Sequence, residues 1–123
     1  MGAPVVHFEV IGSDGAALRS FYSRMFDWEF QEVGGSMDYG VVQRDGNTLD
    51  DGTGIGGGIG GGERSTHLTF YVQVEDIQAS LARAEELGGR RVTEPDDVPG
   101  AGILIAQVTD PEGHLIGLVQ PVR

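Results

Sequence analysis

The chain has 123 residues and a formal net charge of −11, because 19 Asp and Glu residues outweigh 8 Lys and Arg residues. This length predicts a single domain, residues 1–123, that can bury a small core. A surface this acidic repels phosphate backbones and anionic lipids, so nucleic acids and membranes are excluded as expected partners. A cationic ligand or a second subunit is easier to accommodate.

The sequence contains no cysteine, which excludes disulfides and thiolate chemistry. Its first residues, MGAPVVHFEV, lack the basic and apolar regions of a signal peptide. No apolar run reaches the roughly 18–20 residues of a membrane span. We therefore expect a cytoplasmic protein.

The first half predicts one strand, one helix and three further strands. Residues 5–11 (VVHFEVI) alternate in polarity, which indicates a strand with His7 and Glu9 on one face. Ser13 or Asp14 can cap the following helix. Its apolar stripe consists of Ala17, Leu18, Phe21, Tyr22, Met25 and Phe26. The three predicted strands cover residues 29–33, 39–44 and, weakly, part of 54–60.

The second half repeats this order. The segment THLTFYVQV predicts a strand with His67, Thr69 and Tyr71 on one face. Glu75 or Asp76 begins a helix with apolar residues in register, and two glycines at 88–89 end it. The last three predicted strands cover residues 90–94, 102–108 and 114–120.

A shift of 60 residues aligns the two halves and carries His7 to His67 and Phe21 to Leu81. The sequence therefore predicts an α+β protein made of two βαβββ modules, at about residues 4–61 and 65–121. One such module cannot cover the concave face of its own sheet. Pairing two modules side by side predicts a half-open mixed-sheet barrel, with a cavity inside and the helices outside.

Eight glycines lie between Gly52 and Gly62, and the run matches the phosphate-binding pattern G-x-G-x-x-G twice. A phosphate site needs a helix N-terminus directly after the glycines. Here a strand follows, so the phosphate interpretation fails. A flexible linker is one alternative. We interpret residues 54–60 as a thin fourth strand that merges into a linker by Gly62, because Ile55 and Ile59 lie inside the run and the 60-residue shift aligns it with the predicted final strand. Glycine in such a strand lets a ligand or a partner backbone approach closely.

The two-module pattern resembles the vicinal oxygen chelate superfamily, which includes glyoxalase I, bleomycin-resistance proteins and extradiol dioxygenases. The helix-ending FYSRMFDWEF and the DPEG turn before the final strand are the most specific pieces of this resemblance. Together the matching passages span most of the chain: VVHFEVIGSDGAALRSFYSRMFDWEF, THLTFYVQVEDIQASLARAEELGG, VPGAGILIAQVTDPEG and HLIGLVQP.

The resemblance implies where a metal ion would be held. Metal-dependent members place His, Glu, His and Glu on the first and fourth strands of the two modules. His7 and His67 match the two histidines, whereas Gly57 and Gly117 stand at the two carboxylate positions. Glu9 shares a face with His7 and could complete a set of two histidines and one carboxylate, as non-haem iron prefers. No cofactor is expected, and a divalent metal, if present, would use His7, His67 and Glu9.

We therefore expect a glyoxalase/bleomycin-resistance-like protein whose cavity binds a small organic ligand without a metal. The alternative is a metal-dependent lyase, isomerase or dioxygenase that uses His7, His67 and Glu9. A metal-independent enzyme with Glu9 or a histidine as general base stays open, and no catalytic residue is assigned. Tyr39 could contact the ligand or face solvent. The resemblance also implies a homodimer. The expected cavity residues are His7, Glu9, His67, Thr69, Tyr71, Gly57 and Gly117.

Overall fold

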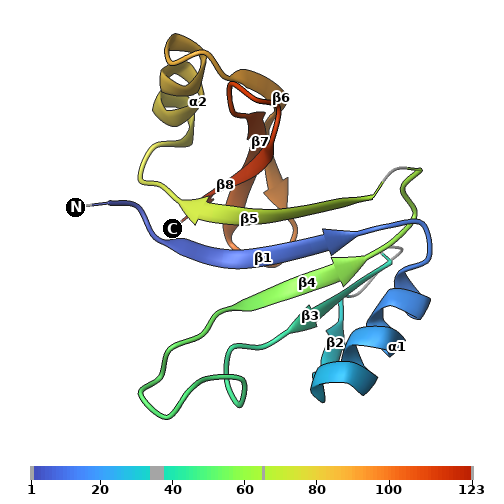
Figure 1. Cartoon of the computed structure of the whole chain (residues 1–123). Helices are drawn as coiled ribbons and strands as arrows, with labels where there is room; N and C mark the ends of the chain where they lie inside the picture. The colour runs from blue at the N-terminus through green and yellow to red at the C-terminus, as the bar shows by residue number, and fades with distance from the viewer. Residues whose placement is uncertain (1, 34–37, 65, 123) are drawn as a thin grey trace. The chain divides into compact units, whose positions relative to one another are not determined.

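The computed structural model describes residues 2–33, 38–64 and 66–122, and these ranges contain eight strands and two helices. They divide into two compact units, His7–Leu68 and Thr69–Arg123, of which the second also includes Met1–Val6 (Figure 1). The elements in chain order are β1 (Val5–Ile11), α1 (Gly15–Phe26), β2 (Phe30–Glu32), β3 (Tyr39–Val42), β4 (Gly56–Gly60), β5 (His67–Gln73), α2 (Ile77–Glu86), β6 (Arg90–Val98), β7 (Ile103–Thr109) and β8 (Leu115–Pro121).

The two units share one topology. In the His7–Leu68 unit, β1 runs parallel to β4, which pairs antiparallel with β3, and β3 pairs antiparallel with β2. In the Thr69–Arg123 unit, β5 runs parallel to β8, followed by β7 and β6 in antiparallel order. Helix α1 packs on β4, and α2 packs on β6, β7 and β8. The predicted α+β class and the two βαβββ modules are confirmed.

An aspartate caps each helix. The Asp14 side chain accepts a hydrogen bond from the backbone N–H of Ala17 at 3.0 Å, and Asp76 accepts one from Ala79 at 3.1 Å. These bonds satisfy backbone donors that have no partner within the first helical turn. Of the alternatives that the sequence left open, Asp14 and Asp76 are therefore the caps.

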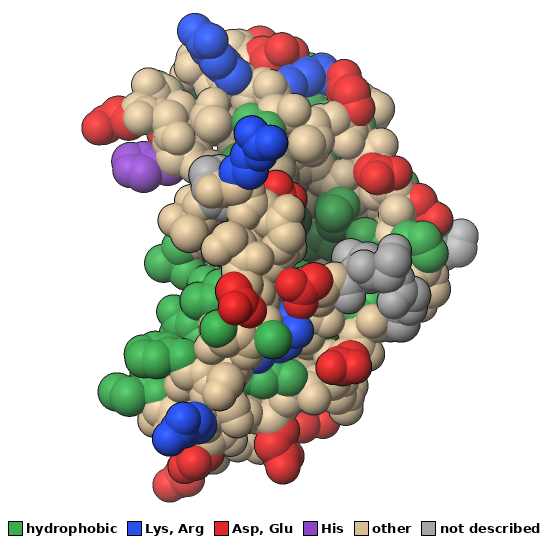
Figure 2. All heavy atoms as spheres, turned by 90° about the vertical axis from the view of Figure 1, so that its right-hand side faces the viewer, with side chains coloured by type: hydrophobic (Ala, Val, Ile, Leu, Met, Phe, Trp, Pro, Cys, Tyr) green, Lys and Arg blue, Asp and Glu red, His purple; other side chains and the backbone are tan. Residues whose placement is uncertain are grey.

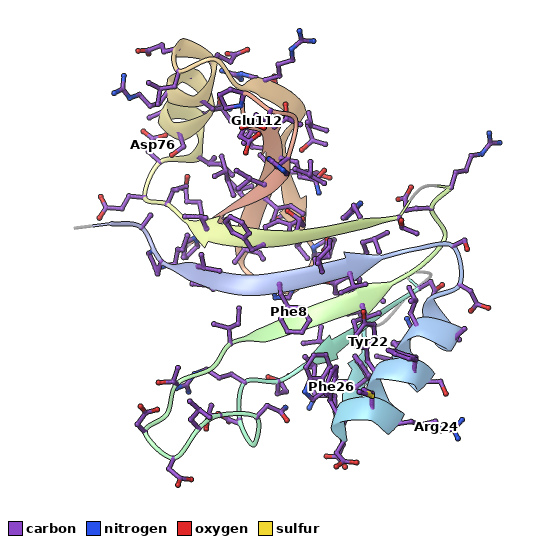
Figure 3. All side chains as sticks on the ribbon, in the orientation of Figure 1. Phe8, Tyr22, Arg24, Phe26, Asp76 and Glu112 are labelled. Carbon is purple, nitrogen blue, oxygen red and sulfur yellow. The ribbon has the colours of Figure 1, made fainter. Side chains whose placement is uncertain are left out.

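Each unit has its own hydrophobic packing. In the Thr69–Arg123 unit, Ile77 and Leu81 of α2 pack against β7 and β8. In the His7–Leu68 unit, Ile59 is fully buried, and Phe8 packs on Trp28 with a ring-centroid distance of 5.4 Å. In Figure 3, Tyr22 and Phe26 point from α1 toward the strands, where both contact the same Trp28 ring. This aromatic cluster holds α1 against the strands of its own unit.

The acidic composition is visible on the surface, where Asp and Glu side chains are spread over the face shown in Figure 2 rather than gathered at one point. In the described ranges, neither helix is long and apolar enough to cross a membrane.

The glycine-rich strand β4 supports a tyrosine ring. The predicted thin strand within residues 54–60 is observed at Gly56–Gly60. The ring of Tyr39, on the neighbouring strand β3, lies over two of these glycines. A Cβ atom at Gly58 would collide with the Tyr39 ring and hydroxyl, and one at Gly60 would lie 2.7 Å from Tyr39 Cδ1. The Tyr39 ring therefore occupies the space that side chains at Gly58 and Gly60 would fill.

We expect Gly58→Ala to lower the free energy of unfolding by about 1–3 kcal/mol, the usual cost of overpacking a filled site. In a Tyr39→Ala background the same substitution should cost much less, because the colliding ring is gone. Chemical denaturation of the four proteins of this double-mutant cycle measures both values. An equal cost in both backgrounds would contradict the packing described here.

Candidate functional site

Four polar side chains meet in the His7–Leu68 unit. His7 and Glu9 lie two residues apart on β1, Tyr39 begins β3, and His67 begins β5. The Tyr39 hydroxyl oxygen lies 2.9 Å from His7 Nε2 and donates to Glu9 Oε2 at 3.1 Å. His67 Nε2 lies 3.3 Å from Glu9 Oε1. We call His7, Glu9, Tyr39 and His67 the polar cluster.

The hydrogen bonds of the polar cluster assign its protons. A tyrosine hydroxyl carries one proton, and here Tyr39 donates it to the Glu9 carboxylate. His7 therefore carries a proton on Nε2 and donates it to the phenolic oxygen. An ionised carboxylate only accepts, so His67 likewise donates from Nε2 to Glu9. Hydrogen bonds therefore connect all four side chains, in the order His7, Tyr39, Glu9 and His67.

Burial decides the charge of His7. Desolvation lowers the pKa of His7 from its ordinary value of 6.5, and the nearby Glu9 carboxylate offsets only part of this effect. His7 is therefore uncharged at neutral pH. The Glu9 side chain is 13% exposed and that of His67 is 28% exposed. The polar cluster thus combines a largely buried carboxylate with an imidazole that solvent can reach.

Three predicted site residues lie in the Thr69–Arg123 unit. The Thr69 hydroxyl donates to the backbone carbonyl of Leu115, so this buried residue holds β5 against β8. Gln107 donates from Nε2 to the Tyr71 hydroxyl at 3.2 Å. Gly117 pairs with Tyr71, and a Cβ at Gly117 would collide with the Tyr71 ring. Each unit therefore places a tyrosine ring over a glycine of its fourth strand.

Gly57, which the 60-residue shift placed at a carboxylate position, faces Phe8 and not Glu9. Gly57 pairs with Phe8, and a Cβ there would collide with the Phe8 ring. Gly58 is the β4 residue that pairs with Glu9. The 60-residue shift fails here because the parallel registers differ. The shift carries Tyr71, which pairs with Gly117, back to Ile11, but Ile11 pairs with Gly60 instead of Gly57.

The family resemblance raises the question of a metal ion. In the described parts of the chain, no group of three or more His, Asp or Glu residues comes together in a way that could hold one. Both oxygens of Glu9 accept hydrogen bonds from neighbours, and the Nε2 atoms of both histidines are directed at such neighbours. Gly58 and Gly117, which lie under tyrosine rings, bring no carboxylate.

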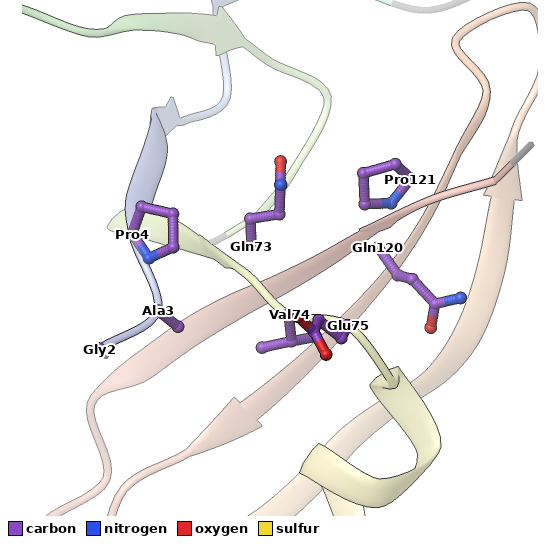
Figure 4. Close-up of a pocket in the computed structure, with 8 residues that line it drawn as sticks. All are labelled: Gly2, Ala3, Pro4, Gln73, Val74, Glu75, Gln120 and Pro121. Atoms are coloured by element: carbon purple, nitrogen blue, oxygen red, sulfur yellow. The ribbon is translucent and has the colours of Figure 1, made fainter.

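A separate hollow of about 810 Å³ lies within the Thr69–Arg123 unit (Figure 4). No residue that the sequence predicted for the site lines it. The Gln120 side chain at its edge is already used by the fold, because its oxygen accepts from the backbone N–H of Ile77 at 2.8 Å. The lining residues are Gly2, Ala3, Pro4, Gln73, Val74, Glu75, Gln120 and Pro121.

Comparison with known proteins places these features in a family. A model of the glyoxalase-like domain matches residues 8–119. A protein of Synechocystis sp. named probable lactoylglutathione lyase is 27% identical over 91% of this chain and 79% of its own length. Protein CFP32 of Mycobacterium tuberculosis is 34% identical over 45% of this chain. That match spans only 21% of CFP32, about a fifth of the relative's length.

Solved structures share the fold of the whole chain. Methylmalonyl-CoA epimerase of Streptomyces coelicolor, in complex with 2-nitronate-propionyl-CoA, has a TM-score of 0.67 and 17% identity, covering 98% of this chain and 99% of its own. A glyoxalase/bleomycin resistance protein/dioxygenase superfamily member from Vibrio splendidus has a TM-score of 0.64 and 19% identity, covering 97% and 99%. The fold predicted from the sequence is thus confirmed, and with the domain match over residues 8–119 the chain belongs to the glyoxalase-like family.

Proposed function

We propose that this chain is a metal-free member of the glyoxalase-like family that binds a small organic molecule at the polar cluster. One observation carries the proposal. The Tyr39 hydroxyl bonds to both His7 and Glu9, the two residues of β1 best suited to hold an ion. Because the Tyr39 hydroxyl already forms hydrogen bonds with His7 and Glu9, no ion is needed to hold these two side chains together. The polar cluster still offers several hydrogen-bonding atoms to a small molecule.

The donor set does not fit a divalent ion in this arrangement. Mg²⁺ and Mn²⁺ favour several carboxylate or water oxygens, and a site with two histidines and one carboxylate suits Fe²⁺. To bind any of these ions through the Nε2 atoms, His7 and His67 would have to give up their present contacts, and Glu9 would lose the hydrogen bond that it accepts from Tyr39. The fourth strands offer no second carboxylate, because Gly58 and Gly117 stand there.

The negative charge of Glu9 and of the whole chain restricts which ligands can bind at the polar cluster. Glu9 brings a carboxylate, and His7 is uncharged at neutral pH because burial lowers its pKa. The whole chain carries a net charge of −11. An anionic ligand would therefore be repelled, whereas a cationic group or a neutral donor would gain a hydrogen bond to a charged acceptor. We propose an uncharged or cationic ligand.

The relatives support a small-molecule role without naming the ligand. The Streptomyces epimerase structure holds 2-nitronate-propionyl-CoA. A coenzyme A ester is strongly anionic, so the charge of the present chain favours a different compound. The homodimer, the cytoplasmic location and the module boundaries stay predictions.

The same polar cluster supports a second candidate, metal-independent acid–base catalysis. An uncharged imidazole can accept a proton, and the hydrogen-bonded chain from His7 through Tyr39 to Glu9 could pass it on. This candidate shares the binding surface of the first and differs only in whether the bound molecule reacts.

Two measurements on protein purified without chelator test the proposal. Elemental analysis should find no stoichiometric divalent metal, and added Mn²⁺ or Zn²⁺ should not raise the melting temperature. Ligand-observed NMR with a library of aromatic amines, neutral aromatic compounds and aromatic acids should give hits among the first two classes. Glu9→Gln should weaken amine hits by about tenfold, equal to about 1.4 kcal/mol.

The matched control is Glu75→Gln, which removes an exposed carboxylate at the hollow of the other unit and should leave these affinities unchanged. A stoichiometric metal that is lost in Glu9→Gln would overturn the proposal. So would hits that respond to Glu75→Gln and not to Glu9→Gln.

The pH dependence of stability tests the burial of His7. Because the pKa of His7 is lowered in the folded state, the unfolded chain binds more protons as the pH falls. The free energy of unfolding should therefore hold steady well above the ordinary value of 6.5 and decline below it. His7→Gln should remove this part of the decline between about pH 8 and about pH 5. His114→Gln, at an exposed turn, is the control, and identical profiles for wild type and His7→Gln would contradict the assignment.

A further inference from the structure

We infer that Arg19 of α1 is a positioning residue for the Tyr39 hydroxyl, which it holds in place from the opposite face of the sheet. The inference rests on the proposed function, because it concerns the side chain that links His7 to Glu9. The sequence analysis did not single out Arg19, whose hydrogen bonds go to Asp38 and Ile59.

Arg19 forms hydrogen bonds with both strands that hold the Tyr39 ring, β3 through the preceding residue Asp38 and β4 through Ile59. Its Nη2 atom forms an ion pair with Asp38 Oδ1 at 2.8 Å, and its Nη1 atom donates to the carbonyl of Ile59 at 3.0 Å. Asp38 directly precedes Tyr39, and Ile59 lies between the two glycines that carry the ring. One guanidinium group therefore connects the residue before β3 to the next-to-last residue of β4.

Small residues make room for this guanidinium. A Cβ at Gly40 would lie 2.6 Å from Arg19 Cδ, and a Cβ at Gly15 would lie 2.8 Å from Arg19 Nη1. A Cβ at Gly61 would lie 2.6 Å from Asp38 Oδ2. The backbone N–H of Gly61 also donates to the Asp38 carbonyl at 2.9 Å. The Arg19 side chain is only 16% exposed, so its position is closely defined.

The geometry explains why arginine is needed. Its planar fork can reach a carboxylate and a carbonyl together, whereas a lysine ammonium acts as a single point charge. In the pairing of β3 with β4, Gly40 lies opposite Ile59 and Tyr39 lies opposite Gly60. The contacts of Arg19 are therefore at the residue pairs that hold the Tyr39 ring. Hydrogen bonds need a donor–acceptor distance of about 2.5–3.2 Å and weaken steeply when the angle at the hydrogen falls below about 120°. A small slip of β3 would therefore break the contacts of the hydroxyl with His7 and Glu9.

The experiment follows the His7 side chain by long-range proton–nitrogen NMR at a mildly alkaline pH. In the wild type, the nitrogen shifts should report a proton on Nε2 and a hydrogen bond to Tyr39. Tyr39→Phe should change them. Arg19→Gln should change the His7 nitrogen shifts in the same direction, and the shifts of Arg19→Lys should lie between those of Arg19→Gln and the wild type. The double variant Arg19→Gln/Tyr39→Phe should have the same His7 shifts as Tyr39→Phe alone.

Two controls separate positioning from a general loss of stability. Arg24→Gln removes the same charge from an arginine of α1 that points away from the strands in Figure 3, and it should leave the His7 shifts unchanged. Asp14→Ala destabilises the same helix by removing its cap, at a cost of about 1 kcal/mol, and should also leave them unchanged.

Wild-type shifts in Arg19→Gln, with altered shifts in Tyr39→Phe, would overturn the positioning role and leave the proposed function standing. Wild-type shifts in Tyr39→Phe itself would overturn both. If Arg19→Gln does not fold, Arg19→Lys tests the positioning role instead. His7 shifts identical to those of the wild type in Arg19→Lys would show that the planar guanidinium is not needed, and would overturn the inference.

Discussion

The contact between the Tyr39 ring and the glycine backbone of β4 is the constraint on which the candidate site depends. The ring can lie flat on the strand only because Gly58 and Gly60 have no side chains. In that position its hydroxyl reaches His7 and Glu9 together. The glycine-rich strand thus links the local sequence to the chemistry of the site, although glycine in a strand costs roughly 0.5–1 kcal/mol per residue relative to alanine.

The polar cluster brings two histidines and one carboxylate together around the hydroxyl of Tyr39. The phenol of Tyr39 donates to Glu9 and accepts from His7, so the buried polar atoms are satisfied by the protein itself. In the second unit, Tyr71 covers Gly117 and is held by Gln107. Both units thus place a tyrosine ring over a glycine of their fourth strand. The tyrosines come from different strands, since Tyr39 belongs to β3 and Tyr71 to β5.

Local patterns predicted the elements because each pattern has a direct physical cause. Alternating polarity located β1 and β5, and aspartate caps located both helices. The apolar stripe of α1 was less reliable as a guide to burial. Phe21 is 58% exposed and Met25 is 62% exposed, although both belong to that stripe.

The site was predicted in part. His7, Glu9 and His67 come together as their shared strand faces suggested, but the role of Tyr39 was left open. Its partners lie about thirty residues away in the sequence, and only the pairing of β3 with β4 reveals that glycines leave space for the ring. The register of β4 was misjudged for a related reason. Nothing local in a run of glycines distinguishes Gly57, which faces Phe8, from Gly58, which faces Tyr39.

The most direct test of the central claim is a high-resolution crystal structure of protein purified without chelator and crystallised in the presence of Mn²⁺, with anomalous diffraction recorded. The account predicts that the Tyr39 hydroxyl lies within hydrogen-bonding distance of His7 Nε2 and Glu9 Oε2, with no anomalous peak beside them. An anomalous peak coordinated by His7, Glu9 and His67, with the Tyr39 ring turned away from Gly58, would contradict it.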